Sequence, residues 1–233
     1  MWRECRVSKS GQHSAIPAGR SVKRAFDIAL SLIGLVFLSP LLVVLAIWIK
    51  LDSPGAVFYR GVRGGRFGTP FRIFKLRTMV ANAEQLGGAE TRADDPRITR
   101  VGARLRYYKL DELPQLINVV LGDMSLVGPR PEVMEEVALY TECERQILLA
   151  RPGITDWASI KFRHEAELLR GSPDVHATYH SKIRPEKVRL AIEYVHHHSL
   201  LIDCKIILAT LRAIFQHPTN PSSARSPEET EAI

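Results

Sequence analysis

The stretch IALSLIGLVFLSPLLVVLAIWI, residues 28–49, decides how the rest of the chain must be organised. It contains 22 residues without a charge, between Asp27 and Lys50. This length exceeds the roughly 18 apolar residues that mark a segment able to enter a lipid bilayer. A buried helix of a soluble protein is a poor alternative at this length, so we predict that the stretch is inserted into a membrane.

Ser39-Pro40 lies near the middle of this segment. Proline removes a backbone donor and clashes with the preceding turn, so the helix should kink or break there. The two halves would be about 18 and 15 Å long at 1.5 Å per residue, each too short for a hydrocarbon core of about 30 Å. They could dip into the membrane and return to the same face. A kinked spanning helix is an equal alternative, because membrane helices tolerate proline and basic residues flank both ends.

The composition divides the remainder of the chain around this segment. Residues 1–19 are polar and rich in Ser, Gly and basic side chains, which predicts a flexible arm and not a signal peptide. The membrane helix is expected over residues 20–51. Residues 52–215 contain no second stretch apolar enough to span, so they should form one domain on one side of the membrane. Prolines, serines and acids over residues 216–233 predict a disordered tail.

Short strands and helices are expected within that domain. Residues 56–59 and 71–76 read as strands separated by a glycine-rich loop, 61–68. Helices are predicted from Asp111 to a stop at Gly122, over 131–150, and over 185–197. Residues 200–215 are apolar with basic edges at Lys205 and Arg212. That pattern suits a helix lying in the membrane interface, and an ordinary amphipathic helix facing the core fits it equally well.

The charge balance is basic, with 32 Lys and Arg against 25 Asp and Glu, a net charge of +7. An excess of this size favours partners that carry phosphate, although a solvated basic surface gives the same composition. The three cysteines are widely spaced and form no CxxC pair, which favours a reducing, cytosol-facing location.

Asp111-Glu112 is the first candidate for chemistry. A carboxylate pair at a helix start could supply a nucleophile or a metal ligand where the helix N-terminus also favours phosphate. The simpler interpretation is that Asp111 caps the helix and Glu112 is a first-turn acid, and these two residues alone favour that interpretation.

Basic residues near the pair alter this balance. Lys75 and Arg77 end a predicted strand, Arg106 precedes the pair, and Arg130 lies in a Gly-Pro-Arg-Pro turn that could hold its guanidinium in place. Each of these cations singly is more often a surface residue. Together with the acids they match what phosphoryl transfer requires, which is charge neutralisation and a Mg²⁺ ligand.

Other motifs give less evidence about function. The glycine-rich stretch does not fit GxxxxGK[ST] or GxGxxG, and no GxSxG, HExxH or CxxC element is present. His196, His197 and His198 are consecutive on a predicted helix, so they point in different directions and cannot easily share one ion.

Several stretches, in order along residues 20–215, resemble the monotopic phosphoglycosyl transferases, also called bacterial sugar transferases. The matching pieces are KRAFD with the apolar segment broken at Ser39-Pro40, PFRIFKLRTM, DDPRITRVGARLR, KLDELPQLINVVLGDMSLVGPRPEV, RPGIT and YVHHHSLLIDCKIILATL. The long fourth piece is highly specific, whereas RPGIT alone is not.

The resemblance implies a fold and a location. The fold is a small mixed α/β core with a re-entrant N-terminal membrane helix bent at Ser39-Pro40 and interfacial amphipathic helices. The location is the bacterial inner membrane with the catalytic domain facing the cytosol.

The resemblance also implies a reaction in two displacements. Asp111 attacks the sugar-side phosphate of an NDP-sugar, expected to be a UDP-sugar, and a nucleoside monophosphate leaves. Undecaprenyl phosphate then attacks the phosphosugar-Asp111 intermediate. Mg²⁺ neutralises the diphosphate, with Asp111 as its ligand. Glu112 acts either as a base or by orienting the site, and the phosphate binders carried over are Lys75, Arg77, Arg106 and Arg130.

The residues after RPGIT depart from the family pattern. Asp156-Trp157-Ala158-Ser159 replaces the commoner Gly-Trp or Gly-Leu followed by Gln, and residues 161–169 also differ. This puts the identity of the sugar in doubt, and the glycoconjugate pathway and oligomeric state, a homo-oligomer included, stay open.

Two other functions compete with this one. A membrane-anchored binding protein could use its basic charge for nucleic acid or anionic lipid, but the interleaved aromatics of a nucleic-acid surface are missing, so we expect no nucleic acid among the partners. An anchored Mg²⁺ phosphohydrolase would explain the acids and cations equally well.

Overall fold

The computed structural model describes residues 18–86 and 91–215. The predicted tail and all but the end of the predicted arm therefore lie outside the described residues. The α-helices are α1 (Ala18–Asp52), α2 (Arg100–Tyr107), α3 (Gln115–Leu121), α4 (Met134–Ala138), α5 (Trp157–Lys161), α6 (Glu165–Leu168), α7 (Val175–Thr178), α8 (Arg184–His197) and α9 (Leu200–Phe215). The strands are β1 (Phe58–Tyr59), β2 (Val62–Gly64), β3 (Pro70–Arg72), β4 (Lys75–Leu76), β5 (Ser125–Val127) and β6 (Gly153–Thr155). Short 3-10 turns lie at Arg66–Gly68, Ala83–Gln85, Leu110–Glu112 and Glu144–Leu149, and a π-helical turn lies at Tyr179–Ile183.

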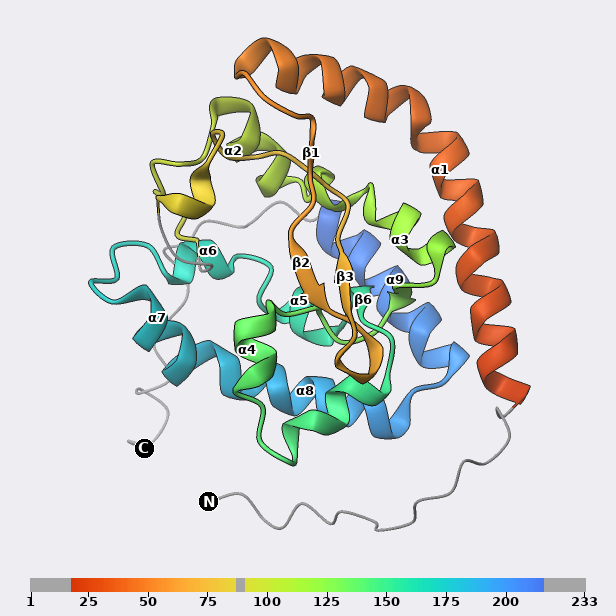
Figure 1. The fold of residues 1–233 in the computed structure, drawn as a ribbon. Helices are drawn as coiled ribbons and strands as arrows, with labels where there is room; N and C mark the ends of the chain where they lie inside the picture. Colours follow the sequence, from red (N-terminus) through yellow and green to blue (C-terminus); the bar gives the residue numbers. More distant parts are fainter. Residues whose placement is uncertain (1–17, 87–90, 216–233) are drawn as a thin grey trace, which may run out of the picture.

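Helix α1 is continuous through Pro40, and it bends midway along its length so that it follows first one side of the domain and then another (Figure 1). Only 11% of its most apolar 18-residue stretch is buried, which is far too little for the core helix of a soluble protein. Its first half packs on α3, and Gly34 lies so close to Leu116 that an added Cβ would come within 3.2 Å of the leucine Cδ1. Its second half buries Leu45 and Ile49 against the start of the domain. Exposed apolar side chains on such a helix indicate membrane association.

Strand pairing is minimal in the described residues. It makes three two-stranded sheets, β1 with β4 and β2 with β3 antiparallel, and β5 with β6 parallel. The predicted strand 56–59 is observed as β1, whereas the predicted strand 71–76 is divided between β3 and β4, and the predicted loop 61–68 contains β2. The prediction missed this division because β3 and β4 pair with different partners, and such long-range pairing is not visible in local periodicity.

The main hydrophobic core joins α3, β5, α8 and α9. Val119, Met124, Val127, Tyr194 and Ile206 are its buried members. This core places the end of β5, and therefore the Gly-Pro-Arg-Pro turn that follows it, against the C-terminal helices. This arrangement of helices and short strands confirms the prediction of a small mixed α/β core.

The predicted helix over 131–150 is wrong as a single element. The chain forms α4 and then a separate 3-10 turn at Glu144–Leu149. Between them the Glu144 carboxylate accepts hydrogen bonds from the backbone N–H and the hydroxyl of Thr141, at 2.8 and 3.0 Å. Such local side-chain bonds compete with the helical ladder, which explains why the helix stops. The predictions of a helix over 185–197 and of a stop at Gly122 are confirmed, and Gly122 has the positive φ of 101° that a glycine stop adopts.

Helix α9 combines the two interpretations left open by its sequence. Asp203 and Ile206 are buried on one face. Leu201, Leu208 and Leu211 are exposed on another, with Leu201 76% exposed. The helix therefore faces the core and also presents an apolar surface.

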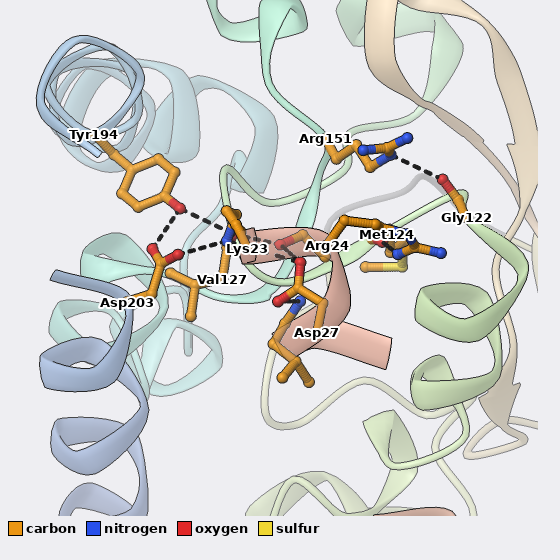
Figure 2. Close-up of polar contacts among 11 residues, drawn as sticks. Lys23, Arg24, Asp27, Gly122, Met124, Val127, Arg151, Tyr194 and Asp203 are labelled. Atoms are coloured by element: carbon orange, nitrogen blue, oxygen red, sulfur yellow. Dashed lines mark hydrogen bonds and ion pairs between the residues drawn. The ribbon is translucent and has the colours of Figure 1, made fainter. Parts of the chain in front are cut away.

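A polar cluster joins the start of α1 to the rest of the domain, and we call it the anchor cluster: Lys23, Asp27, Ser125, Tyr194 and Asp203. Figure 2 labels all of these residues except Ser125. Lys23 Nζ lies 2.6 Å from Asp203 Oδ2, and the Tyr194 hydroxyl lies 2.7 Å from Asp203 Oδ1. The same lysine and tyrosine also reach the carbonyl of Val127, at 3.2 and 3.0 Å. Helices α1, α8 and α9 thus meet on the Asp203 carboxylate, and Lys23 and Tyr194 also bind α1 and α8 to strand β5 through the Val127 carbonyl.

Asp27 extends the anchor cluster to β5. Its Oδ2 accepts the Ser125 hydroxyl at 2.7 Å, and its Oδ1 accepts the backbone N–H of Leu126 at 3.4 Å. Next to it, Arg24 donates to the carbonyls of Val120 and Met124. All four carboxylate oxygens of Asp27 and Asp203 therefore have a donor, as buried carboxylates require.

Candidate active site

Asp111 and Glu112 lie in a 3-10 turn that comes before α3, and both are buried, Asp111 to 2% exposure. The turn begins at Lys109, which has a positive φ of 57°. Neither acid makes a side-chain capping bond for the turn, and α3 begins after Pro114 without one. The interpretation of Asp111 as a helix cap is therefore wrong, because its carboxylate is directed into side-chain contacts instead.

Two cations hold the acid pair. Lys75 Nζ lies 3.0 Å from Asp111 Oδ2 and 3.2 Å from Glu112 Oε1. Arg130 donates to both oxygens of Glu112, from Nη2 to Oε1 at 2.5 Å and from Nη1 to Oε2 at 3.3 Å. This is the bidentate pairing that guanidinium geometry favours. Each oxygen of Glu112 thus has a positive partner, while Asp111 has one on Oδ2 alone.

Local structure fixes both cations. Lys75 begins β4 and is paired across the strand with Tyr59. Arg130 follows Gly128, whose carbonyl and amide meet Gly153 so closely that a Cβ on Gly153 would lie 2.1 Å from the Gly128 nitrogen. A side chain cannot fit there, so the two loops touch through their backbones. This contact fixes the position of the turn that carries Arg130.

Close to the acid pair, Asp111 Oδ1 and Arg106 Nη1 are buried without a hydrogen-bond partner among the described residues. Burial lowers the pKa of the Arg106 guanidinium, and Asp111 opposes that shift. Unsatisfied buried groups are costly and uncommon, and in a cavity they mark the place where a ligand supplies the missing partner. The pair has opposite charges, so it would suit a ligand that presents both a phosphate oxygen and an electrophilic centre.

The charges also set the protonation of Glu112. Burial by itself would raise the pKa of this carboxyl, but Arg130 and Lys75 outweigh burial and hold the pKa well below its usual range. The pKa of Arg130 is raised above its ordinary value, first by Glu112. Glu112 is therefore a carboxylate at neutral pH and is a poor proton acceptor.

These residues border a cavity of about 710 Å³. Lys75, Arg106, Lys109, Asp111, Glu112 and Arg130 line one side of it. Apolar side chains before and within α3 and in α9 also border the cavity, namely Leu113, Leu116, Ala213 and Ile214. The segment that departs from the family pattern, including Asp156 and Ser159, also borders the cavity, and Asp156 caps α5 by accepting the N–H of Ser159 at 2.6 Å.

The structure does not bring Arg77 to this cavity. Its guanidinium donates to the carbonyls of Ile49 and Pro54 and, at 2.8 Å, to that of Ser53, where α1 ends. The carbonyls at a helix C-terminus lack intrahelical partners, and Arg77 satisfies them. Lys75 and Arg77 are two residues apart and would share a face of a continuous strand, but β4 ends at Leu76 and Arg77 turns to the end of α1 instead.

Sequence reasoning missed four further polar residues on the cavity wall. Glu132, Glu165, Tyr179 and Lys187 all border the cavity. Glu132 lies inside the motif that contains Arg130, and this position was a signal for including it. Glu165, Tyr179 and Lys187 come from separate helical segments, and no local pattern marks them.

Two groups of side chains have atoms that could bind a metal ion. Asp111 offers a buried oxygen without a partner, and one carboxylate completed by phosphate oxygens and water is the ligand set that Mg²⁺ usually takes. Glu136, His176 and His180 also bring ligand atoms within 4.8 Å of one another. Two imidazoles suit a transition metal and not Mg²⁺. Glu136 Oε2 already lies 3.6 Å from Arg184 Nε and its Oε1 lies 3.3 Å from His180 Nε2, so this carboxylate has a cationic partner in Arg184.

Comparison with known proteins places this geometry in a family. The model of the bacterial sugar transferase family matches residues 18–217. A UDP-N-acetylgalactosamine-undecaprenyl-phosphate N-acetylgalactosaminephosphotransferase of Aeromonas hydrophila is 36% identical over 203 residues, covering 83% of this chain and 43% of that protein. A UDP-glucose:undecaprenyl-phosphate glucose-1-phosphate transferase of Escherichia coli K12 is 36% identical over 196 residues, covering 82% of this chain and 40% of that protein.

A shorter relative is matched over most of its length. The exopolysaccharide production protein ExoY of Sinorhizobium fredii is 35% identical over 213 residues, covering 85% of this chain and 87% of that protein. The first two relatives are longer, and the chain spans only about two fifths of each.

Proposed function

The chain belongs to the bacterial sugar transferase family, and on that premise we propose that it transfers a sugar-1-phosphate from an NDP-sugar, most simply a UDP-sugar, to undecaprenyl phosphate. The observation that carries the proposal is the buried Asp111 carboxylate, which has one oxygen on Lys75 and the other without a partner, beside an equally unpaired Arg106 nitrogen. The names of relatives that use UDP-sugars and undecaprenyl phosphate support the choice of substrates.

Two displacements at phosphorus account for the chemistry. An oxygen of Asp111 forms a bond to the sugar-side phosphorus while the bond from that phosphorus to the bridging oxygen breaks, and a nucleoside monophosphate leaves with the bridging oxygen. An oxygen of undecaprenyl phosphate then forms a bond to the same phosphorus, and Asp111 leaves as a carboxylate. The products are a nucleoside monophosphate and a polyprenyl diphosphosugar. A carboxylate can serve as both nucleophile and leaving group, so one difficult transfer becomes two easier ones.

The residues around Asp111 have separate tasks in this proposal. Lys75, Arg106 and Arg130 neutralise the phosphate oxygens, where charge develops. Glu112 holds Lys75 and Arg130 in position, because its depressed pKa makes it unsuited to accept a proton. We therefore favour the orienting role of Glu112 over that of a base.

Mg²⁺ is the cofactor that this donor set would take. Asp111 would hold it together with phosphate oxygens of the donor, and the bound ion would supply neutralisation of the diphosphate charge. The unpartnered Asp111 Oδ1 supports this assignment.

For the membrane, we propose that α1 dips into the cytoplasmic leaflet of the bacterial inner membrane and returns, with the domain on the cytosolic side. Both ends of α1 pack on the same domain: Lys23 at its start pairs with Asp203, and Ile49 near its end packs on Leu105. A straight helix of 35 residues would extend about 52 Å and carry its two ends to opposite sides of the bilayer. The exposed apolar face of α9 would lie in the interface.

The function is tested with the purified chain in detergent or nanodiscs. UDP-sugars are screened for release of UMP in the presence of undecaprenyl phosphate and Mg²⁺, with the lipid product followed by mass spectrometry. UMP release that needs Mg²⁺ and yields a lipid-linked diphosphosugar is expected. Free sugar phosphate without a lipid product would instead favour a phosphohydrolase and contradict the proposal.

The topology has its own test. Single cysteines placed before Asp27 and after Lys50, in a variant without native cysteines, are labelled from one side of sealed vesicles. Labelling of both from the same side is expected. Labelling from opposite sides would rule out the re-entrant helix.

A further inference from the structure

The cavity beside Asp111 has a second polar side that the proposed phosphate chemistry does not use. We call it the acidic wall: Glu132, Glu165, Tyr179 and Lys187. Glu132 follows the Gly-Pro-Arg-Pro turn, Glu165 begins α6, Tyr179 lies in the π-helical turn, and Lys187 is on α8. Glu132 is therefore brought together with three residues that lie more than 30 positions later in the chain, and all four border a single cavity.

The contacts within the acidic wall leave one carboxylate under-used. Lys187 forms an ion pair with Glu165, and its Nζ lies 5.0 Å from the ring centroid of Tyr179. The Tyr179 hydroxyl lies 3.4 Å from Glu132 Oε1, which is a long hydrogen bond. No other hydrogen bond to the Glu132 carboxylate is formed by the described residues. Glu132 is thus a half-buried acceptor on the cavity surface with most of its capacity unfilled.

The charges decide what kind of group this carboxylate can receive. Burial raises the pKa of Glu132, and Glu165 and Glu136 add to that shift, while Lys187 and Arg130 oppose it. A phosphate would be repelled by Glu132 and by the neighbouring carboxyl groups of Glu165 and Glu136. A neutral hydrogen-bond donor would bind favourably, because it satisfies the carboxylate without adding charge. The cavity therefore has a phosphate side and a hydroxyl side.

The two sides are joined at one short piece of chain. Arg130 and Glu132 flank Pro131, Arg130 pairs with Glu112, and Glu132 contacts Tyr179. A sugar bonded directly to the phosphate at Asp111 lies one bond beyond that phosphate. The ribose of the nucleotide is separated from it by a further phosphate. The hexose is thus the part of an NDP-sugar that this spacing brings to Glu132.

Resting on the proposed function, we propose that Glu132 accepts hydrogen bonds from two adjacent hydroxyls of the donor hexose, with Tyr179 holding the carboxylate, and that this contact selects the sugar. A diol matches a carboxylate because each oxygen can accept one hydroxyl. A site built in this way rejects an analogue that lacks a hydroxyl, since the carboxylate, enclosed by the bound donor, is then left without its partner. Lys187 and Glu165 neutralise one another and serve as the outer support of this pocket.

The test compares Glu132→Gln with a matched control, Glu135→Gln. Glu135 is an exposed acid in the first turn of α4 and does not border the cavity. For each protein, kcat and KM of UMP release are measured with UDP-glucose, UDP-galactose, UDP-N-acetylgalactosamine and deoxy analogues of the donor that works best. Inhibition by UDP, which carries the ribose and phosphates without a hexose, is measured in parallel.

We expect Glu132→Gln to raise KM for the preferred donor about 10- to 100-fold and to narrow its advantage over the deoxy analogues. Inhibition by UDP and all constants of Glu135→Gln should equal those of the wild type. Unchanged KM and selectivity in Glu132→Gln would overturn the inference. An equal loss of UDP inhibition would overturn it too, because the diol would then be that of the ribose.

Two further measurements distinguish failure of this inference from misfolding of the variant and from failure of the proposed function. If Glu132→Gln has a lower Tm than the wild type, Tyr179→Phe replaces it, since that change removes only one hydroxyl. A raised KM in Tyr179→Phe would support the inference, and an unchanged one would overturn it. A wild-type chain that releases UMP from none of the donors would overturn the proposed function itself.

Discussion

Two buried clusters of acids and bases lie in this domain, and they differ in how completely their atoms are paired. In the anchor cluster both oxygens of Asp203 accept strong donors, from Lys23 at 2.6 Å and Tyr194 at 2.7 Å. At the site, Asp111 Oδ1 and Arg106 Nη1 have no partner among the described residues. Burial is the same, 1% exposure for Asp203 and 2% for Asp111. A network in which every polar atom is paired stabilises the fold, whereas a network with unpaired atoms can bind a ligand.

The most severe test of this comparison is Asp111→Asn. We expect kcat to fall by a factor on the order of 10⁴ or more, because an amide cannot be the nucleophile. The free energy of unfolding should change by only about 1 kcal/mol, since the lost carboxylate was half unpaired. UMP release and thermal unfolding in detergent measure the two effects. Retained turnover, or trapping of a phosphosugar adduct on the variant, would contradict the assigned nucleophile.

Asp203→Ala should show the opposite behaviour. It leaves Lys23 and the Tyr194 hydroxyl without their shared acceptor, so we expect a loss of about 3 kcal/mol in the free energy of unfolding. Activity per folded molecule should stay within a few-fold of the wild type. The double variant Lys23→Met with Asp203→Leu replaces both charges and should recover most of the stability. If the double variant is no more stable than Asp203→Ala, the pairing of these charges is not what stabilises the start of α1.

Tyr194→Phe is a milder change in the anchor cluster. It removes one hydroxyl that reaches Asp203 Oδ1 and the carbonyl of Val127. We expect the free energy of unfolding to fall by about 1–2 kcal/mol, because Asp203 keeps Lys23 but loses its second donor. The Tm gives the effect, with kcat as the control that should not move. A Tm equal to that of the wild type would indicate that water replaces the hydroxyl.

The smallest effect is expected in how the stability contributed by Glu112 depends on pH. Its folded pKa is depressed, so the stability it contributes is present above its unfolded pKa of about 4.3 and is lost as pH falls through the folded pKa. The difference in Tm between the wild type and Glu112→Gln should therefore be constant from about pH 8 to pH 5.5 and should narrow below about pH 4.3. A difference that changes between pH 6 and 7 would mean that Glu112 titrates near neutrality, which would restore its role as a base.

The sequence predicted one class of feature well, namely elements set by local chemistry. The apolar helix with its proline, the stop at Gly122 and the helix over 185–197 follow from periodicity, backbone freedom and capping. The divided strands β3 and β4 and the interruption after α4 did not, because distant partners and a Thr141–Glu144 contact decide them.

The candidate site was predicted in the same uneven way. Lys75, Arg106 and Arg130 were expected near Asp111 and Glu112, and the structure brings them to one cavity. Arg77 was expected there as well, and it caps α1 instead. The acidic wall was not expected, because Glu165, Tyr179 and Lys187 become neighbours only through the packing of α6, the π-helical turn and α8.

Residue order alone predicted an apolar helix suited to a membrane and a motif in which adjacent acids are followed by a basic turn. Residue type and short-range spacing are enough for such features, since they depend on the polarity and backbone preferences of neighbouring residues. The tertiary structure alone decided which charged groups are paired. Asp203 and Asp111 have the same side chain and nearly the same burial, and only the distances to residues far along the chain leave one satisfied and the other open.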